Sequence, residues 1–276
     1  MTEEPQTPPS ETPDEIGHEE MASDPLPPLY VLVAEDVKVN QMVIKAMLER
    51  DGHVVTVAAN GRQAVMAVRE QDYDMILMDV QMPEMDGVEA TRHIRAMPEE
   101  RAARTPILAM TANLLDGDAD RCIAAGMTGI LVKPLNPTEL NAVLQRLFAI
   151  DAPPLPAPVL TVSDPDRVFD TAPVSQLLEV LPPAKVASLL DGAKASITAS
   201  RASLMEASVA GDVVSMETHA HKLAGVAGIF GCPKLMALAR RIEAAARDDA
   251  GGLLAQLQGV LAEAVAALDA EKAKIA

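Results

Sequence analysis

Short apolar runs alternate with amphipathic segments between residues 29 and 148, and this alternation restricts the fold more than any other feature. Strands that are apolar on both faces must be covered on both faces, which parallel strands achieve through helical crossovers. We therefore predict a doubly wound α/β domain over residues 29–149, with five strands and five helices. The strand-type runs are LYVLVA, HVVTVA, DMILMD, PILAM and GILV, and the clearest helical segments are NQMVIKAMLER, GRQAVMAVRE, GVEATRHIRAM and TELNAVLQRLF.

Residues 169–276 carry a different pattern, because apolar side chains recur there at spacings of three and four. A stripe of this kind is typical of a helix that buries one face. Three stripes and a further histidine-bearing segment predict an antiparallel four-helix bundle, with breaks at Gly211-Asp212 and at Gly231-Cys232-Pro233. The stripes consist of Val186, Leu190, Ala193, Ile197, Ser200 and Leu204; of Leu235, Leu238, Ile242 and Ala245; and of Leu254, Leu257, Leu261, Ala264 and Leu268.

Two segments lack periodicity altogether. Residues 1–28 contain eight acidic residues, seven prolines and no Lys or Arg, a composition that cannot bury enough apolar area to offset the entropy of ordering. We predict that this acidic tail is disordered. Residues 150–168 are rich in proline and predict a semi-stiff linker between the two domains.

Composition restricts the partners and the compartment. The net charge of −17 argues against nucleic acid as a partner, because phosphate-backbone binding needs a basic surface. Cys122 and Cys232 fall in different predicted domains, which argues against a disulfide framework. No run of 18 apolar residues and no signal-peptide pattern is found, so we expect a cytoplasmic protein without membrane insertion.

Charged and polar side chains stand at the ends of the predicted strands. Glu35 and Asp36 follow the first strand and Asp79 ends the third, while Thr111 and Lys133 stand at the ends of the fourth and fifth. The carboxyl ends of parallel strands share one edge of a sheet, so we expect these side chains to converge. Three carboxylates would repel one another there, and oxygen-rich sites of this kind suit Mg²⁺. The set is what phosphorylation of a carboxylate requires.

Residues 29–149 resemble a response-regulator receiver domain of two-component signalling. The motifs that carry the resemblance are VLVAEDVKVNQMV, ILMDVQMPEMDGVEA, ILAMTAN and AAGMTGILVKP, in this order and spacing. The resemblance implies a flavodoxin-like fold in which Asp79 is the phospho-acceptor. It further implies that Asp36 and Asp79 bind Mg²⁺ directly, that Glu35 acts through water, and that the backbone carbonyl of Gln81 is a further ligand.

By the same resemblance, Thr111 and Lys133 contact the phosphoryl group, and the Lys133-Pro134 peptide bond is cis. The alternative for the acidic residues is a structural one, in which they cap helices or remain solvated loop charges. A hydrolase of the haloacid dehalogenase type also uses a nucleophilic aspartate in an α/β fold. Such an enzyme ordinarily carries a second acid two residues after the nucleophile, where Gln81 stands here.

The stretch HAHKLAGVAG contains two histidines and two glycines on one predicted helix. At about 100° per residue, His221 lies roughly 140° from the centre of the helix's apolar stripe, whereas His219 lies only about 60° from it. We therefore expect His221 to face solvent beside Gly225 and Gly228, and His219 to be a partly buried structural residue. The stripe consists of Val213, Met216, Ala220, Leu223, Ala227 and Phe230.

This stretch resembles the histidine phosphotransfer (HPt) domain, a four-helix bundle with a phospho-accepting histidine. The resemblance covers residues 169–276, and the motif AHKLAGVAGIFG aligns His221 with the phospho-acceptor. The family often has lysine three residues after that histidine. Here Ala224 takes that position, and Lys222 follows the histidine directly.

Together the two resemblances imply a phosphorelay protein without a kinase domain. Asp79 would accept a phosphoryl group from a histidine kinase, or from another phosphohistidine, and exchange it with His221 for transfer to a second two-component partner. On this interpretation the chain is not an enzyme in the ordinary sense. The direction of transfer and the choice between transfer within and between chains stay open.

Two alternatives also stay open. The helical domain could dock on a partner without carrying phosphate, which would make the chain a phosphorylation-gated binding module. The chain could also be the detached C-terminal part of a hybrid kinase. The sequence names neither the kinase, the downstream regulator nor the stimulus, and it sets neither the phosphate lifetime nor the oligomeric state.

Overall fold

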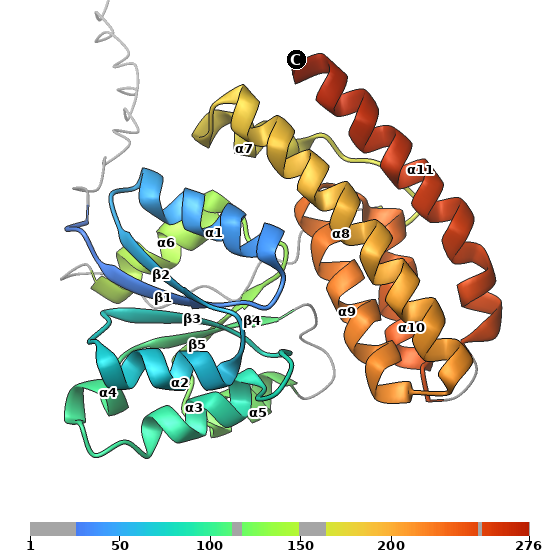
Figure 1. Cartoon of the computed structure of the whole chain (residues 1–276). Helices are drawn as coiled ribbons and strands as arrows, with labels where there is room; N and C mark the ends of the chain where they lie inside the picture. The colour runs from blue at the N-terminus through green and yellow to red at the C-terminus, as the bar shows by residue number, and fades with distance from the viewer. Residues whose placement is uncertain (1–25, 112–117, 149–163, 248–249, 276) are drawn as a thin grey trace, which may run out of the picture.

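The computed structural model describes residues 26–111, 118–148, 164–247 and 250–275. Figure 1 shows a sheet covered by helices on both faces and, beside it, a bundle of long helices. The predicted disordered tail, residues 1–28, and the predicted linker, residues 150–168, lie for the most part outside the described residues.

Five parallel strands form one sheet in the order β2-β1-β3-β4-β5, which confirms the doubly wound α/β fold. The chain runs outward from β1 to β2 and then returns to β3 on the other side of β1. The reversal point of the sheet therefore lies between β1 and β3, where Ala34 pairs with Met78. The strands are β1 (Tyr30–Ala34), β2 (Val54–Ala58), β3 (Met75–Asp79), β4 (Ile107–Thr111) and β5 (Gly129–Val132).

Helices cover both faces of the sheet: α1 and α6 on one, and α2, α3 and α5 on the other (Figure 1). The described residues include one short helix, α4, beyond the five that the sequence pattern predicts. Its sequence ERAAR is too short to show a helical period, so the sequence pattern does not indicate this helix. The helices are α1 (Lys38–Arg50), α2 (Gly61–Glu70), α3 (Gly87–Arg95), α4 (Glu100–Arg104), α5 (Asp118–Ala124) and α6 (Pro137–Phe148).

The second domain is a bundle of four long helices preceded by one short one, and its core consists of the predicted stripes. Both predicted breaks are confirmed. Gly211 ends α8 with φ +68°, and Asp212 caps α9 by accepting a hydrogen bond from the backbone N–H of Ser215. Pro233 begins the helix after the second break. The helices are α7 (Ala172–Val180), α8 (Pro183–Ala210), α9 (Val213–Ile229), α10 (Pro233–Ala245) and α11 (Gly251–Ile275).

Gly231 shows why the second break needs a glycine. Its φ is +72°, and a Cβ there would collide with the carbonyl oxygen of Asp170. The backbone N–H of Asp170 in turn donates to the carbonyl oxygen of Gly231 at 2.7 Å. A side chain at this position would break the contact that holds the start of the helical domain against its α9–α10 turn.

Helix α11 is long and apolar enough to cross a membrane by length and composition, with a mean hydropathy of 1.4 over 18 residues. The core helix of a soluble bundle passes the same test. One side of α11 packs into the bundle through Leu254, Leu257, Leu261 and Leu268. Its contacts are with α8 and α10.

The two domains pack against each other through α1 (Figure 1), which is apolar on two sides. Ile44 and Leu48 face the sheet. Val39, Val43 and Met47, spaced four residues apart, instead join the core of the helical bundle. The α/β domain thus buries a helix face against the second domain that it would otherwise expose to water.

Candidate functional site

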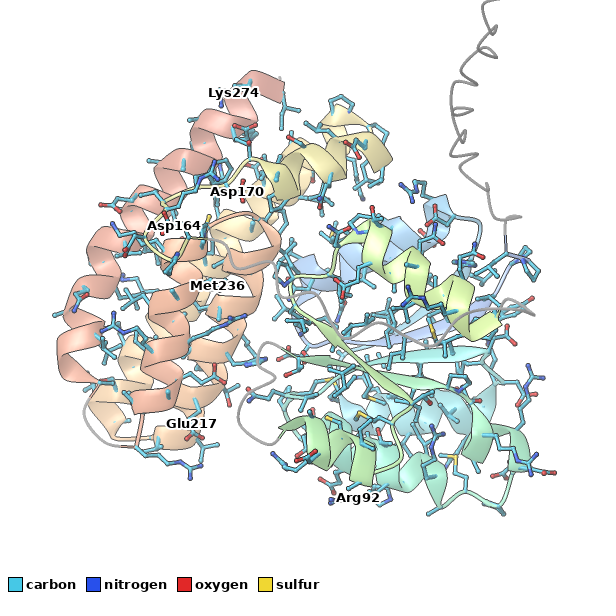
Figure 2. All side chains as sticks on the ribbon, turned by 180° about the vertical axis from the view of Figure 1, so that it is seen from behind. Arg92, Asp164, Asp170, Glu217, Met236 and Lys274 are labelled. Atoms are coloured by element: carbon cyan, nitrogen blue, oxygen red, sulfur yellow. The ribbon has the colours of Figure 1, made fainter. Side chains whose placement is uncertain are left out.

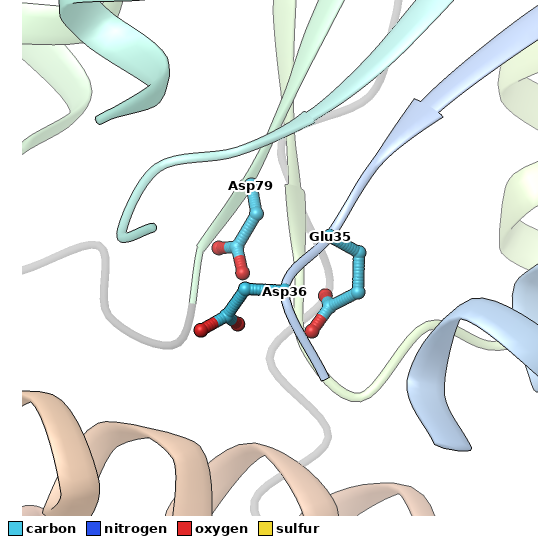
Figure 3. A group of neighbouring side chains, drawn as sticks. All are labelled: Glu35, Asp36 and Asp79. Atoms are coloured by element: carbon cyan, nitrogen blue, oxygen red, sulfur yellow. The ribbon is translucent and has the colours of Figure 1, made fainter. Parts of the chain in front are cut away.

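Three carboxylates converge at the carboxyl edge of the sheet, as Figure 3 shows. Glu35 and Asp36 follow β1 directly, and Asp79 is the last residue of the neighbouring strand β3. One oxygen from each carboxylate lies within 4.8 Å of the others. Glu35 and Asp79 are almost completely buried, at 0% and 1% exposure. The sequence prediction that these acids meet is confirmed by this cluster.

Lys133, which directly follows β5, supplies a positive charge in the middle of the acids. Its Nζ lies 2.7 Å from Glu35 Oε2 and 2.7 Å from Asp79 Oδ2. Burial alone would lower the pKa of Lys133, but the two carboxylates raise it above its ordinary value, so the ammonium stays charged. The Lys133-Pro134 peptide bond is cis, as predicted. Thr111 ends β4 and is buried at the same edge of the sheet.

Burial has the opposite effect on Asp79. It raises the pKa of this carboxyl to about 7, and Glu35 adds to the rise, while Lys133 and His221 hold it back. Burial thus favours the protonated form of Asp79 more than it would for an aspartate in water. The oxygens of Asp36 and Asp79 form the kind of donor set that a hard divalent cation prefers, and such a cation would favour the ionised form.

His221 lies on α9 and is buried, with 7% of its surface exposed. Its Nδ1 is 3.1 Å from Glu243 Oε1 on α10. Its Nε2 is buried and has no hydrogen-bond partner among the described residues. Burial lowers the pKa of His221, but Glu243 and Asp79 together raise it above its ordinary value. The charge of His221 lowers the pKa of Asp79, and the charge of Asp79 raises the pKa of His221, so the two groups interact electrostatically.

The prediction that His221 faces solvent is wrong for this structure. The histidine lies one helical turn before Gly225, on the face of α9 that meets Asn40 of the first domain. The first domain covers it instead. His219, expected to be partly buried, is half-buried, and burial lowers its pKa.

Gly225 and Gly228 explain how the first domain approaches α9 so closely. A Cβ on Gly225 would lie 3.6 Å from Asn40 Nδ2 at the start of α1. A Cβ on Gly228 would lie 3.5 Å from Pro134 Cδ of the first domain, but it would come closer, to 2.9 Å, to Met236 Sδ on α10 of its own bundle (Figure 2). The bare helix face that we expect from the sequence to face solvent is covered in the structure by the other domain of the same chain.

Lys222 joins the two domains directly. Its Nζ lies 2.8 Å from Asp36 Oδ2, across the interface from α9 to the loop after β1. Burial raises the pKa of Asp36, and the Lys222 ammonium opposes that rise. Lys222 lies about 100° around the helix from His221. The two side chains therefore point in different directions, but both can reach the pocket of the first domain that faces α9.

A cavity of about 380 Å³ opens between the domains beside these groups. Gln81 and Asp86 line it from the β3–α3 loop, and His221, Lys222 and Glu243 line it from the bundle. The cavity reaches His221 and also Lys222, the lysine that pairs with Asp36. Small ions and water can therefore reach the space between the two domains.

Sequence reasoning missed two residues of the site. Asn40 donates through Nδ2 to Glu35 Oε1 at 3.0 Å and fixes that carboxylate. Glu243 contacts His221 from a different helix, 22 residues further along the chain. Glu243 directly follows Ile242 of a predicted apolar stripe, but no local pattern shows which residue of a neighbouring helix it meets.

The fold and the site define a carboxylate pocket of the receiver type, packed against a histidine on a helical bundle. Comparison with known families identifies both parts. The family described as the response regulator receiver domain matches residues 31–145, and the Hpt domain family matches residues 186–271. The chain therefore carries a receiver domain followed by an Hpt domain, two phosphotransfer modules of phosphorelay signalling.

Its curated relatives include two sensor proteins that match most of the chain. The aerobic respiration control sensor protein ArcB of Escherichia coli is 30% identical over 224 residues, which cover 79% of this chain and 28% of ArcB. The sensor histidine kinase AruS of Pseudomonas aeruginosa is 33% identical over 223 residues, covering 81% of this chain and 21% of AruS. The chain thus spans less than a third of the length of these relatives.

Among solved structures, the receiver domain of the sensor histidine kinase PA1611 from Pseudomonas aeruginosa is 48% identical. The match covers 44% of this chain and 97% of the PA1611 receiver-domain chain, with a TM-score of 0.41. That crystal structure contains a magnesium ion coordinated in its active-site cleft.

Proposed function

We propose that this chain passes a phosphoryl group between Asp79 of its receiver and His221 of its own Hpt domain. The observation that carries the proposal is the burial of His221 at the domain interface. Its Nε2 has no hydrogen-bond partner in the described part of the chain, and its pKa responds to the charge of Asp79. A surface histidine meant only for external partners would have no reason to be covered by the chain's own receiver.

The chemistry is an in-line exchange of one phosphoryl group. In one direction the Nε2 lone pair of His221 attacks the phosphorus of the acyl phosphate on Asp79. The N–P bond forms, the P–O bond to the carboxylate breaks, and Asp79 leaves as a carboxylate. In the other direction the Asp79 carboxylate attacks phosphohistidine. The reacting nitrogen must be unprotonated, so the imidazole must hold its proton on Nδ1.

Glu243 meets this requirement. Its carboxylate lies 3.1 Å from Nδ1 and accepts a hydrogen bond only when that nitrogen carries the proton. The tautomer that this bond favours leaves the Nε2 lone pair free. We therefore assign Glu243 a positioning role, because it acts on the phosphoryl group only through His221.

The receiver contributes charge neutralisation. Lys133 pairs with Asp79, and Thr111 ends the adjacent strand β4; an ammonium and a hydroxyl both stabilise phosphoryl oxygens, which supports these two residues as their contacts. Asp36, Asp79 and the Gln81 carbonyl would hold Mg²⁺ directly, with Glu35 acting through water. Bound Mg²⁺ would supply charge neutralisation between the carboxylate and the phosphoryl oxygens.

The proposed place in signalling is an intermediate position. A sensor histidine kinase or another phosphohistidine would load the chain, and a receiver domain or response regulator would unload it. The compartment consistent with those partners is the cytoplasm. If the Hpt domain were instead a binding module without phosphate, His221 would remain unlabelled under all conditions.

Transfer within one chain can be tested by complementation. A small phosphodonor such as acetyl phosphate should label the wild-type chain with acid-labile, base-stable phosphate on His221, and both Asp79→Asn and His221→Gln should prevent this. An equimolar mixture of the two variants restores only transfer between chains. At low micromolar concentration we expect the mixture to label His221 far more slowly than the wild type, because cis transfer benefits from a high effective concentration.

Two outcomes would contradict the proposal. Labelling of the mixture at the wild-type rate would show that transfer runs between chains. Absence of base-stable phosphate from the wild-type chain, with Asp79 labelled normally, would favour the binding module.

A further inference from the structure

The ion pair between Lys222 and Asp36 connects the Hpt domain to the acid cluster itself. Lys222 leaves α9 immediately after His221, and its Nζ lies 2.8 Å from Asp36 Oδ2. The Asp36 side chain is 4% exposed and that of Lys222 is 25% exposed. The Hpt domain thus places an ammonium on a carboxylate that belongs to the donor set for a divalent cation.

We propose that Lys222 and Mg²⁺ compete for Asp36, so that Mg²⁺ loosens the docked Hpt domain from an unphosphorylated receiver. This inference rests on the proposed function, since it concerns how the same docked pair is regulated. By linkage, any factor by which Mg²⁺ weakens docking is the factor by which docking weakens Mg²⁺ binding.

The charges of the pocket support the competition. Three carboxylates, from Glu35, Asp36 and Asp79, face the two ammonium groups of Lys133 and Lys222. With all five groups ionised, the docked pocket carries one net negative charge. A divalent cation would leave it with one net positive charge. With Lys222 withdrawn, the same cation would leave the pocket neutral, so the cation and the lysine each disfavour the other.

A phosphoryl group reverses this balance. An acyl phosphate on Asp79 replaces one negative charge by two, because the carboxylate loses its charge in the mixed anhydride and the phosphoryl oxygens carry two charges. The docked pocket with Mg²⁺ and Lys222 is then neutral. Docking and Mg²⁺ are therefore compatible when a phosphoryl group is present and antagonistic when it is absent.

The cavity beside the site gives the cation a route. Gln81 and Lys222 both line the space of about 380 Å³ between the domains. A hydrated ion can therefore reach Lys222, whose ammonium pairs with Asp36, without prior separation of the whole interface. In a relay, the phosphorylation state of the receiver would then control which partner can reach His221. A loaded receiver holds the Hpt domain close, and an unloaded one with Mg²⁺ releases His221 to another partner.

Calorimetric titration of the full chain with MgCl₂ tests the competition directly. We expect Lys222→Met to bind Mg²⁺ about tenfold more tightly than the wild type, because the opposing charge is lost while the length of the side chain is kept. Lys222→Arg should stay close to the wild type. The matched control is Lys234→Met, since Lys234 pairs with Glu263 within the bundle and has no part in the pocket.

Interdomain distances provide the second readout. Met66 on α2 and Val209 on α8 are 53% and 89% exposed, so Met66→Cys and Val209→Cys provide sites for spin labels, while Cys122 and Cys232 are buried. Mg²⁺ should broaden the distance distribution between the labels, and added beryllofluoride, a phosphoryl substitute, should narrow it again. In Lys222→Met, Mg²⁺ should change the distribution much less.

Equal Mg²⁺ affinity in the wild type and Lys222→Met would overturn the inference, as would a distance distribution that Mg²⁺ leaves unchanged. Neither result would contradict the proposed function if labelled phosphate still reaches His221. Conversely, tighter Mg²⁺ binding by Lys222→Met in a chain that never labels His221 would support the competition and refute the phosphotransfer.

Discussion

Asp79 and His221 are the two ends of the proposed transfer, and their surroundings are assembled differently. Asp79 is buried by its own domain, because it ends a central strand and its neighbours follow the adjacent strands. His221 lies on a helix surface, and its burial comes from the other domain. The first site is a property of a fold. The second is a property of an interface between two domains.

Replacing Asp79 should have the largest effect. Asp79→Asn keeps the shape of the side chain, but an amide cannot attack phosphorus, so we expect no labelling of the receiver by a small phosphodonor in the presence of Mg²⁺. Asp36→Asn should weaken labelling severely through loss of a cation ligand. Radiolabel incorporation into the full chain is the measurement. Normal labelling of Asp79→Asn would show that another residue is the acceptor.

The two histidines give the next contrast. His221→Gln should eliminate the acid-labile, base-stable phosphate. His219→Gln should retain much of it and lose about 1 kcal/mol of stability, because His219 is half-buried at the edge of the bundle. Thermal unfolding of both variants controls for misfolding. Equal loss of phosphate from two folded variants would mean that the helical angles identify the wrong residue.

The interface itself can be broken at Gly225. A Cβ at this position meets Asn40 Nδ2 at 3.6 Å, an ordinary contact, so Gly225→Ala should transfer normally. Gly225→Gln should lower transfer by about 100-fold, because a longer side chain holds the domains apart. Helicity should stay the same or rise in both variants. Transfer by Gly225→Gln at the wild-type rate, in a folded chain, would show that close approach over α9 is unnecessary.

Glu243 should have a smaller effect with a diagnostic pH dependence. Glu243 raises the pKa of His221, so Glu243→Gln should lower it. Transfer from Asp79 to His221 needs neutral imidazole and rises as the pH passes through that pKa. The rise should therefore move to lower pH in Glu243→Gln, while the plateau rate falls about tenfold through lost orientation of the ring.

Single-turnover transfer rates, measured between about pH 5.5 and 8.5, would show both the displacement of the pH profile and the fall in the plateau rate. A lower plateau without any displacement of the pH profile would indicate a purely structural role for Glu243. Glu217→Gln is a suitable control, because Glu217 lines the same cavity but pairs with Arg247.

The smallest effect concerns the receiver as a switch. Receivers that change an output surface usually carry Tyr or Phe three residues before the lysine, where this chain has Ile130. Ile130 is already partly buried against the apolar core, and its branched Cβ makes it stiff. Beryllofluoride should shift amide resonances strongly near Asp79 and Lys133 but weakly around Ile130 and α6. Large shifts there would show a conformational switch.

The contrast between the two sites also explains what the sequence could predict. The local sequence shows that Glu35, Asp36 and Asp79 stand at the ends of strands. A parallel sheet brings such ends to one edge whatever else the chain does. The apolar stripe of α9 likewise fixes which side of the helix faces its own bundle. Those two rules predicted the α/β fold, the bundle and the acid cluster.

The tertiary structure alone decided how the two domains meet. The sequence shows that α1 is apolar on two sides, with Val39, Val43 and Met47 on the second, but an apolar face does not name what covers it. The contacts of His221 with Glu243 and of Lys222 with Asp36 join residues 22 and 186 positions apart. Such contacts depend on how two complete surfaces dock, and surface docking leaves no periodic signal in either segment.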